Sequence, residues 1–373
     1  MALCILSAFA FLASCSEGMT TDMSGEKTNA EGVEAADELL TGDVTFIAQS
    51  YNDTGKLSRA SYPDATYTTD FYIESVRGSR SRVFIHFESG AGNGLDGEEL
   101  VLASGVNRDA GNSENRLEMT EAWYELILAN GKTNITFGKL DPTYFLDQNR
   151  FANDETMQFI SFAFRNNQAI EFPGNHIGIH LLLSPWPVLE VESEIVDTGP
   201  SMEEIFERSF ASLQVNIKPF ASGRANLRLY AWSNGSRHET IEGGKETGSR
   251  NAGYGTSIDL DISKETGMFF RYGRQNGDLE KIEQFASLGL NLEGDLWGRD
   301  KDLLGAAVAL NSLSGVYRRL TGSSRKEVHI EAYYNWFALE RLSISPDIQI
   351  IFNPYGFAAH RILVFGLRTQ IYL

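Results

Sequence analysis

Apolar and polar residues alternate with a period of two from Asp43 to Leu373, and turn residues interrupt the alternation at intervals. This pattern is typical of β-strands that have one apolar and one polar face. It predicts about sixteen strands, an even number within the range of bacterial outer-membrane barrels. Their expected positions are residues 43–51, 67–76, 81–89, 116–128, 133–140, 175–185, 188–196, 209–220, 223–234, 252–263, 267–275, 284–295, 302–313, 327–339, 342–353 and 360–373.

The connections between these strands alternate between short and long. The short ones include Ala129–Lys132, whose Asn-Gly pair favours a tight hairpin because both residues accept a positive φ. Transmembrane barrels show this alternation because their periplasmic turns are short and their extracellular loops are long. The long connections are expected at residues 52–66, 90–115, 141–174, 197–208, 235–251, 276–283 and 314–326.

The side chains on the two faces of each strand bear on whether the fold is a membrane barrel or a soluble sheet. In the last strand Leu367 and Ile371 share one face, whereas Arg368 and Gln370 share the other. A soluble antiparallel sheet has the same alternation, with its apolar face on a core. Aromatic residues near many strand ends favour the membrane, because outer-membrane barrels carry aromatic girdles at both interfaces. We therefore expect an all-β fold, a transmembrane antiparallel β-barrel.

The segment 116–128 has a less regular pattern, because either choice of faces puts a glutamate or a tyrosine outward. We assign Glu121, Trp123 and Glu125 to the lumen of the barrel. Tyr124 then faces outward with its apolar neighbours.

The longest connection, residues 141–174, lies between the fifth and sixth predicted strands. Loops of this length are uncommon unless they are functional or disordered. This one is rich in aromatic residues, among them Tyr144, Phe151, Phe159 and Phe164, which a solvated linker would not need. The sequence therefore predicts a loop that folds inward and narrows a pore.

The pattern of the N-terminal region predicts an export signal followed by a flexible tether. Residues 1–16 are expected to be a signal peptide, because an apolar run is followed by small residues. Leu12-Ala-Ser-Cys15 also resembles the bacterial lipoprotein box, which would leave a lipidated Cys15; cleavage without lipid is the alternative, and both stay open. Residues 17–42 are acidic and poor in large apolar side chains, which predicts a flexible tail. The barrel domain is expected at residues 43–373.

Composition limits the chemistry of the barrel. The formal net charge of −18 argues against a nucleic-acid partner, which requires clustered basic residues. Both cysteines precede residue 16, so the barrel has no thiolate metal site and no cysteine nucleophile. His176 and His180 share a strand face but lack a third ligand, which predicts no metal site. We expect no cofactor and no enzymatic activity, although abundant carboxylates leave a glycosidase open.

Several motifs together resemble the carbohydrate-selective porin family of Gram-negative outer membranes. The resemblance implies a sixteen-stranded barrel through which mono- or oligosaccharides diffuse, with the connection after Phe137–Pro142 forming the constriction. It extends over most of the chain from Asp43, and one departure is the non-aromatic last residue, Leu373. The motifs are Glu121-Ala-Trp-Tyr-Glu125, Phe137-Gly-Lys-Leu-Asp-Pro142, Asp147–Asp154, Gln158-Phe159, Glu331–Tyr334, Leu342–Gln349, Asn353-Pro354 and Gly366-Leu-Arg368.

Sugar recognition combines planar polar side chains with aromatic surfaces, because a sugar offers hydroxyls and an apolar C–H face. Candidates on the long loop are Asp141, Tyr144, Asp147, Asn149, Arg150, Phe151, Asn153, Asp154 and Arg165. Candidates on the strands are Glu121, Trp123, Glu125, Lys139, Arg228, Trp232, Glu331 and Arg368. The alternative is that the loop residues cap and fix the loop, and that Arg368 pairs with a carboxylate of the barrel.

The sequence thus predicts a passive, sugar-selective porin in the Gram-negative outer membrane. Its expected partners are permeating sugars, membrane lipid and lipopolysaccharide, and association into a homo-oligomer stays open. A lipid-tethered surface protein that binds glycans is the main alternative, and an outer-membrane barrel hydrolase is a further one.

Overall fold

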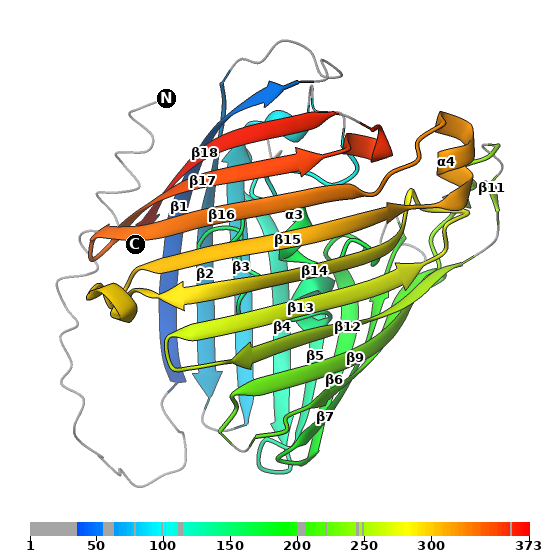
Figure 1. Ribbon diagram of the computed structural model, residues 1–373. Coiled ribbons are helices and arrows are strands. Elements are labelled where there is room, and N and C mark those ends of the chain that lie inside the picture. The colour runs from blue at the N-terminus through cyan, green and yellow to red at the C-terminus, as the bar shows by residue number, and fades with distance from the viewer. Residues whose placement is uncertain are drawn as a thin grey trace, which may run out of the picture. The chain divides into compact units, whose positions relative to one another are not determined.

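The computed structural model describes residues 36–54, 63–77, 80–97, 100, 102–110, 115–199, 206–220, 222–243, 246–247, 250–358 and 360–373. Sixteen strands of this part of the chain pair antiparallel and close into a barrel (Figure 1). This confirms the predicted fold class. The barrel strands are β1 (Ala36–Asp53), β2 (Asp64–Arg77), β3 (Ser81–Ala91), β4 (Glu118–Leu128), β5 (Thr133–Leu140), β6 (His176–Trp186), β7 (Leu189–Asp197), β8 (Ser209–Ile217), β9 (Ala225–Asn234), β12 (Asn251–Asp261), β13 (Thr266–Gln275), β14 (Ile282–Glu293), β15 (Leu303–Leu313), β16 (Glu327–Leu339), β17 (Leu342–Phe352) and β18 (Arg361–Tyr372).

The first and last strands close the barrel. Val44 of β1 pairs with Ile371 of β18 on one side and with Thr69 of β2 on the other. β1 begins at Ala36 rather than at the expected boundary of Asp43, because β2 continues to Arg77 and offers backbone partners to residues 36–42. The end of the expected flexible tail is therefore strand. Residues 1–35, with Cys15 and the expected signal peptide, lie outside the described residues.

The remaining elements lie in the connections. β10 (His238–Glu239) and β11 (Glu246–Thr247) form a small hairpin that the sequence did not predict, because two residues are too few to show a period. The short helices are η2 (Leu95–Gly97), α2 (Pro142–Phe145), α3 (Phe162–Arg165), η3 (Gly294–Trp297), α4 (Gly315–Thr321) and η4 (Pro354–Gly356). Among the described residues, no helix is long and apolar enough to cross a membrane.

The predicted Asn-Gly hairpin is present between β4 and β5. Ala129, Asn130 and Gly131 all have positive φ, at 50°, 56° and 80°. The Gly131 N–H donates to the Leu128 carbonyl at 3.1 Å. The local sequence is therefore sufficient to set this turn, as expected for a hairpin of this type.

The barrel is apolar outside and polar inside. On β18 the outward Phe365 is 51% exposed, whereas its inward neighbour Arg368 is 1% exposed. On β7 the outward Ile195 is 50% exposed and the inward Glu194 is 2% exposed. A soluble sheet would bury the apolar face instead. The observed orientation is that of a barrel surrounded by lipid.

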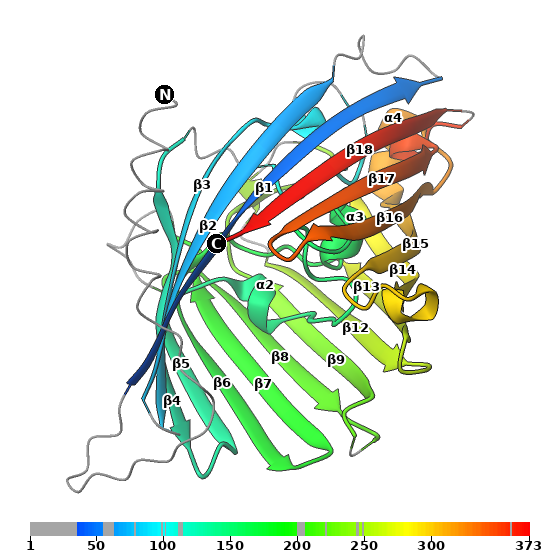
Figure 2. The same cartoon turned by 90° about the vertical axis from the view of Figure 1, so that its left-hand side faces the viewer.

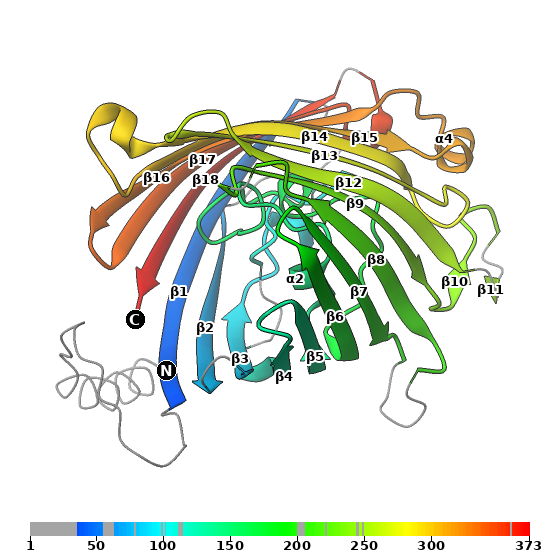
Figure 3. The ribbon, with the colours of Figure 1, turned by 90° about the horizontal axis from the view of Figure 1, so that it is seen from below.

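Two connections fold into the barrel (Figures 2 and 3), and the strands surround α2 and α3. Residues 141–174 pack against β13–β16 through a buried cluster that contains Phe159, Phe164, Phe269 and Phe285. The β3–β4 connection also turns inward and packs against β1, β17 and β18 through a cluster with Val106 at its centre. The inward course of the first loop was expected, and that of the second was not.

Candidate functional site

Arg271 on β13 is the main anchor of the long loop. Its guanidinium is fully buried and lies 3.0 Å from the Asp147 carboxylate. It also donates to the carbonyls of Phe164 and Asp147 at 2.6 and 3.0 Å and to Asn153 Oδ1 at 2.8 Å. Asp147 itself accepts from the Tyr230 hydroxyl at 2.7 Å and from the Asn167 N–H at 2.8 Å. The guanidinium of one strand residue thus holds the loop at three positions, Asp147, Asn153 and Phe164.

Arg368 and Glu331 fix the middle of the same loop. Arg368 donates to the carbonyls of Glu155 and Gln158 at 2.8 and 2.7 Å. The Glu331 carboxylate accepts the N–H groups of Ile160 and Ser161 at 2.6 and 3.0 Å. Buried charges are tolerated when such hydrogen bonds satisfy them. Both residues were predicted to contact solute; in the structure both hold the loop, and their contact with solute stays a prediction.

The second inward loop is fixed in the same way. The Glu327 carboxylate accepts the N–H groups of Ala103 and Ser104 at 2.7 and 3.1 Å. The two loops are also bonded to each other, since the Phe162 N–H donates to the Gly105 carbonyl at 3.1 Å and the Arg108 N–H donates to the Ile160 carbonyl at 2.8 Å. They therefore form one plug of backbone inside one side of the barrel.

Glycines in β13 make room for the loop. A Cβ on Gly267 would lie 2.2 Å from the Phe151 ring, and one on Gly273 would lie 2.4 Å from Asn167 Nδ2. Neither approach is compatible with a side chain on the strand. The loop therefore lies directly against the backbone of this strand.

The other predicted loop residues are mostly structural as well. Asp141 caps α2 by accepting the Thr143 N–H at 2.8 Å, and Asp154 accepts the Thr156 N–H at 2.8 Å. Asn149 donates to Ser257 Oγ at 3.1 Å. Arg150 forms an ion pair with Asp261 at 3.0 Å. These contacts match the alternative that the loop residues cap and fix the loop.

One predicted strand residue, Lys139, is placed differently from expectation, whereas Arg228 and Trp232 face inward as expected. Lys139 faces outward, because its β4 partner is the outward Ala122 while Gly138 takes the inward position opposite Trp123. Its Nζ donates to the Met119 carbonyl at 2.7 Å. Arg228 and Trp232 face inward and are only 6% and 3% exposed, and their contact with solute stays a prediction.

An inward surface that is accessible in part lies on β2–β4, where Asp70, Glu121, Trp123 and Glu125 are at most 9% exposed. We name it the β2–β4 wall. Cross-strand pairing aligns Tyr72 with His86, Phe84 with Trp123, and His86 with Glu121. The side chains of Glu74 and Arg82 are 32% and 29% exposed, unlike the buried anchors of the loop. The wall consists of Asp70, Tyr72, Glu74, Arg82, Phe84, His86, Glu88, Glu121, Trp123 and Glu125.

Aromatic rings form a continuous stripe on this wall. The Tyr72 and His86 rings stack at 4.5 Å, and the Phe84 and Trp123 rings stack at 4.9 Å. Arg82 lies over the Trp123 ring at 4.8 Å from its centroid. Trp123 is itself buried and donates to Glu121 at 3.2 Å, so it supports the partly exposed Phe84 from behind. The prediction of Glu121, Trp123 and Glu125 as inward residues is confirmed, although their contact with solute stays a prediction.

Carboxylates border the stripe. Asp43, Asp70 and Glu88 stand side by side on β1, β2 and β3. The loop residue Glu155 interacts electrostatically with Tyr72 and Glu88 of the wall. Burial raises the pKa of Glu155, but Arg165 and Arg108 outweigh burial and hold that pKa below its ordinary value. The Glu155 carboxylate is therefore charged where the loop faces the wall.

A polar cavity of about 440 Å³ adjoins the loop. Arg108 and Arg165 contribute cations to its lining, while Glu171 and Glu280 contribute carboxylates. The Arg108 guanidinium lies 5.3 Å from the centre of the Phe162 ring. Arg165, a predicted site residue, thus lines this cavity while pairing with Glu155. Tyr144, another predicted residue, is 49% exposed beside Phe145.

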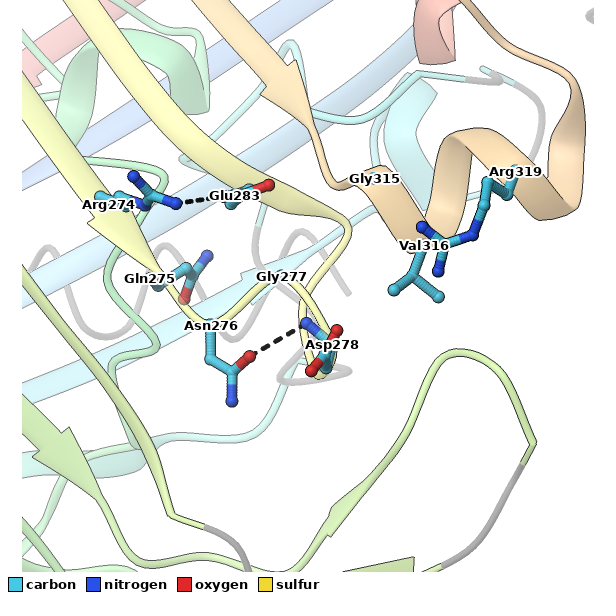
Figure 4. A pocket seen from close by; sticks show the side chains of 9 residues that line it. All are labelled: Arg274, Gln275, Asn276, Gly277, Asp278, Glu283, Gly315, Val316 and Arg319. Atoms are coloured by element: carbon cyan, nitrogen blue, oxygen red, sulfur yellow. Dashed lines mark hydrogen bonds and ion pairs between the residues drawn. The ribbon is translucent and has the colours of Figure 1, made fainter.

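A second pocket, of about 380 Å³, lies between the β13–β14 connection and the start of α4 (Figure 4). Arg274 pairs with Glu283 there at 2.8 Å. The Asp278 N–H donates to Asn276 Oδ1 at 3.0 Å. Its contacts are polar and shallow, so it adds little to the path inside the barrel.

The candidate site residues predicted from the sequence do not include the β2 and β3 members of the wall, such as Tyr72, Phe84 and His86. Alternation in 67–76 and 81–89 was recognised, and it placed these residues on one face of each strand. The resemblance motifs, however, directed attention to the long loop. A signal was available, because the polar face of β2 carries Asp70, Tyr72 and Glu74, and that of β3 carries Arg82, Phe84, His86 and Glu88.

Several known proteins with similar sequences or structures are named porins. Residues 211–373 match the OprB family, described as carbohydrate-selective porins. Porin AaxA of Chlamydia muridarum is 23% identical over 274 residues, which cover 70% of this chain and 56% of that protein. This chain thus spans about half the length of the curated relatives it matches first.

Solved structures show the same fold. OprB of Pseudomonas putida at high pH has a TM-score of 0.75 and 16% identity, covering 90% of this chain and 94% of that one. The DcaP channel of Acinetobacter baumannii has a TM-score of 0.58 and 13% identity, covering 94% and 100% of the two chains. The predicted resemblance is therefore confirmed for residues 211–373, which match the carbohydrate-selective OprB porin family, and the chain shares the closed β-barrel fold of these solved structures.

Proposed function

We propose that this protein is a porin for the passive diffusion of mono- or oligosaccharides across the outer membrane. The observation that carries the proposal is the β2–β4 wall, where stacked aromatic rings lie between partly exposed carboxylates. The long loop is held by strands from β8 to β18, and its Phe145 packs in one cluster with Trp123 and Phe84 of the wall. The side chains of Glu74 and Arg82 stay about a third exposed beside it. The family and fold matched here are typically those of channels without enzymatic activity.

The chemistry of the wall suits a sugar. Phe84 and Tyr72 offer flat apolar surfaces for the C–H face of a pyranose ring. Glu74 and Arg82 offer planar groups that can each bond two neighbouring hydroxyls. Because these contacts are spread along the wall, each is modest, and a channel needs weak successive sites so that solute can leave.

The outer surface suits a lipid environment. Outward residues such as Leu213 and Phe365 are about half exposed and apolar. We expect membrane lipid and lipopolysaccharide to cover this surface. Association of copies through the same surface is a further expectation, which native mass spectrometry in detergent tests.

Planar-bilayer recording tests the proposed function. The purified full chain should open channels of fixed conductance, and added maltose or glucose should reduce the current. Liposomes that contain the protein should swell in isosmotic sugar. Absence of both conductance and sugar-dependent swelling in protein that has folded as a barrel would contradict the proposal.

A further inference from the structure

Three potential metal ligands meet on the β2–β4 wall. One atom each from Asp70, His86 and Glu88 can be chosen so that all three lie within 4.8 Å of one another. Asp70 and Glu88 are directly paired across β2 and β3, and His86 is two residues from Glu88 on the same face. Three ligands that converge from two rigid strands are the usual number of protein ligands in an open zinc site.

Charge at this position favours a bound cation. Like charges directly opposite each other on neighbouring strands are destabilising. Asp70 has a carboxylate neighbour on both sides, Glu88 on β3 and Asp43 on β1. Arg108 of the inward loop interacts with Glu88, and His86 is the group that contacts Asp70 directly. A dication among these carboxylates would relieve the repulsion more fully than a single proton on His86.

His86 has the orientation of a metal-binding histidine. Its Nε2 lies 2.7 Å from Asp70 Oδ1, and its Nδ1 lies 3.5 Å from the Glu121 carboxylate. The Tyr72 ring stacks on the imidazole at 4.5 Å and fixes its plane. Metal-binding histidines usually hold one ring nitrogen to the metal while the other donates to a carboxylate. Glu121 is placed to accept that second hydrogen bond.

We propose that Asp70, His86 and Glu88 form a site for a divalent transition-metal cation of the zinc type. An imidazole with two carboxylates suits such an ion better than the all-oxygen sites of calcium or magnesium. Tetrahedral zinc ligands lie roughly 3.3 Å from one another, so the contact between His86 and Asp70 needs to open by a few tenths of an ångström. Water from the lumen fills the fourth position. Binding places the cation directly on the path proposed for solute.

Equilibrium dialysis of the full chain in detergent against zinc chloride tests the site. We expect wild-type protein to bind one zinc ion per chain. His86→Gln and Glu88→Gln should each weaken binding by about tenfold or more, as loss of a ligand or its supporting group does elsewhere. Zinc-edge anomalous diffraction should place the ion between the two strands.

The matched control is His180→Gln. His180 also faces inward and pairs with a carboxylate, Glu192, at 3.3 Å, but no third ligand of a metal group accompanies it among the described residues. This variant should bind zinc as wild type does. Failure of the folded wild type to bind zinc, or equal loss in His180→Gln and His86→Gln, would overturn the site and leave His86 as a simple counter-charge.

The zinc site and the proposed channel function can be tested independently of each other. Dialysis measures zinc whether or not the protein conducts. In bilayers, zinc should lower the wild-type conductance and should not affect Glu88→Gln. Zinc binding by a protein without conductance would contradict only the proposed function, and conductance without zinc binding would contradict only the site.

Discussion

The two sides of the barrel use inward-facing polar residues in opposite ways. On β13–β18, Arg271, Glu331 and Arg368 are at most 1% exposed and hold loop backbone. On β2–β4, Glu74 and Arg82 keep about a third of their side-chain surface exposed, although Asp70, Glu121 and Glu125 of the same wall are at most 9% exposed. The same alternation of apolar and polar residues therefore yields a closed side and an open side. The difference lies in what packs against each side, and the strand pattern does not encode it.

Loss of the central anchor should have the largest effect on this difference. Arg271→Met leaves the buried Asp147 carboxylate without its cation, which costs about 3–5 kcal/mol when one partner of a buried pair is removed. We expect the loop to leave the wall of β13 and the single-channel conductance to rise severalfold in planar bilayers.

Arg274→Met is the control for that variant. Arg274 lies on the same strand, but its side chain is 47% exposed and its pair with Glu283 is at the rim. Exposed pairs contribute about 0.2–1 kcal/mol, so the conductance should stay near the wild-type value. Unchanged conductance in a folded Arg271→Met channel would mean that the loop does not depend on this anchor.

The aromatic stripe should show the next largest effect. Phe84→Ala removes a partly exposed ring from the β2–β4 wall, and we expect sugar to block the current about tenfold less tightly, a change of about 1.4 kcal/mol. Current noise or titration of block with maltose measures it. Ile85→Ala, the outward neighbour on β3, should leave sugar block unchanged. Equal effects of both substitutions would remove the stripe from the sugar path.

Ion preference should change by a smaller amount. The row of Asp43, Asp70 and Glu88 raises the local concentration of cations in the lumen. Glu88→Gln should lower the potassium-to-chloride permeability ratio by about twofold or less, most clearly at low salt where screening is weak. Reversal potentials in a salt gradient measure the ratio. Glu340→Gln, at the exposed β16–β17 turn, is the control, and a shift of equal size there would contradict a local effect.

Lowering the pH should change the conductance less than any of the substitutions above. Burial raises the pKa of Glu155, while Arg165 and Arg108 outweigh it and lower that pKa overall. A carboxyl with a lowered folded pKa stabilises fully above its unfolded pKa and loses its contribution as the pH falls through the folded value. The change in conductance that Glu155 causes should therefore appear only as the pH falls below the ordinary glutamate range. Glu155→Gln should lack this acid step, and an unaltered step would assign it to another group.

The fold followed from the sequence because strand period, turn chemistry and loop length agreed. The Asn130-Gly131 hairpin and the apolar face of β18 both formed as expected. The early start of β1 escaped prediction because residues 36–42 lack alternation and depend on pairing with β2.

Only part of the candidate site could be predicted from the sequence. The inward course of residues 141–174 was predictable from its aromatic residues, and Glu121, Trp123 and Glu125 were assigned to the correct face. Whether a polar residue anchors a loop or faces the lumen depends on tertiary packing, so the sequence did not show that Asp147, Arg368 and Glu331 hold the loop. Lys139 was misassigned because Gly138, with φ of 142°, occupies the inward position where a Cβ would lie 2.3 Å from the Ala122 carbonyl.

Accessibility of single cysteines tests the central claim most directly. Phe84 and Phe285 both face the interior, but Phe84 lies on the open β2–β4 wall and Phe285 is 1% exposed beneath the loop. In a background with Cys4→Ser and Cys15→Ser, a charged thiol reagent should rapidly reduce the conductance of Phe84→Cys and leave Phe285→Cys unmodified. Equal and rapid modification at both positions would contradict the division into an open and a closed side.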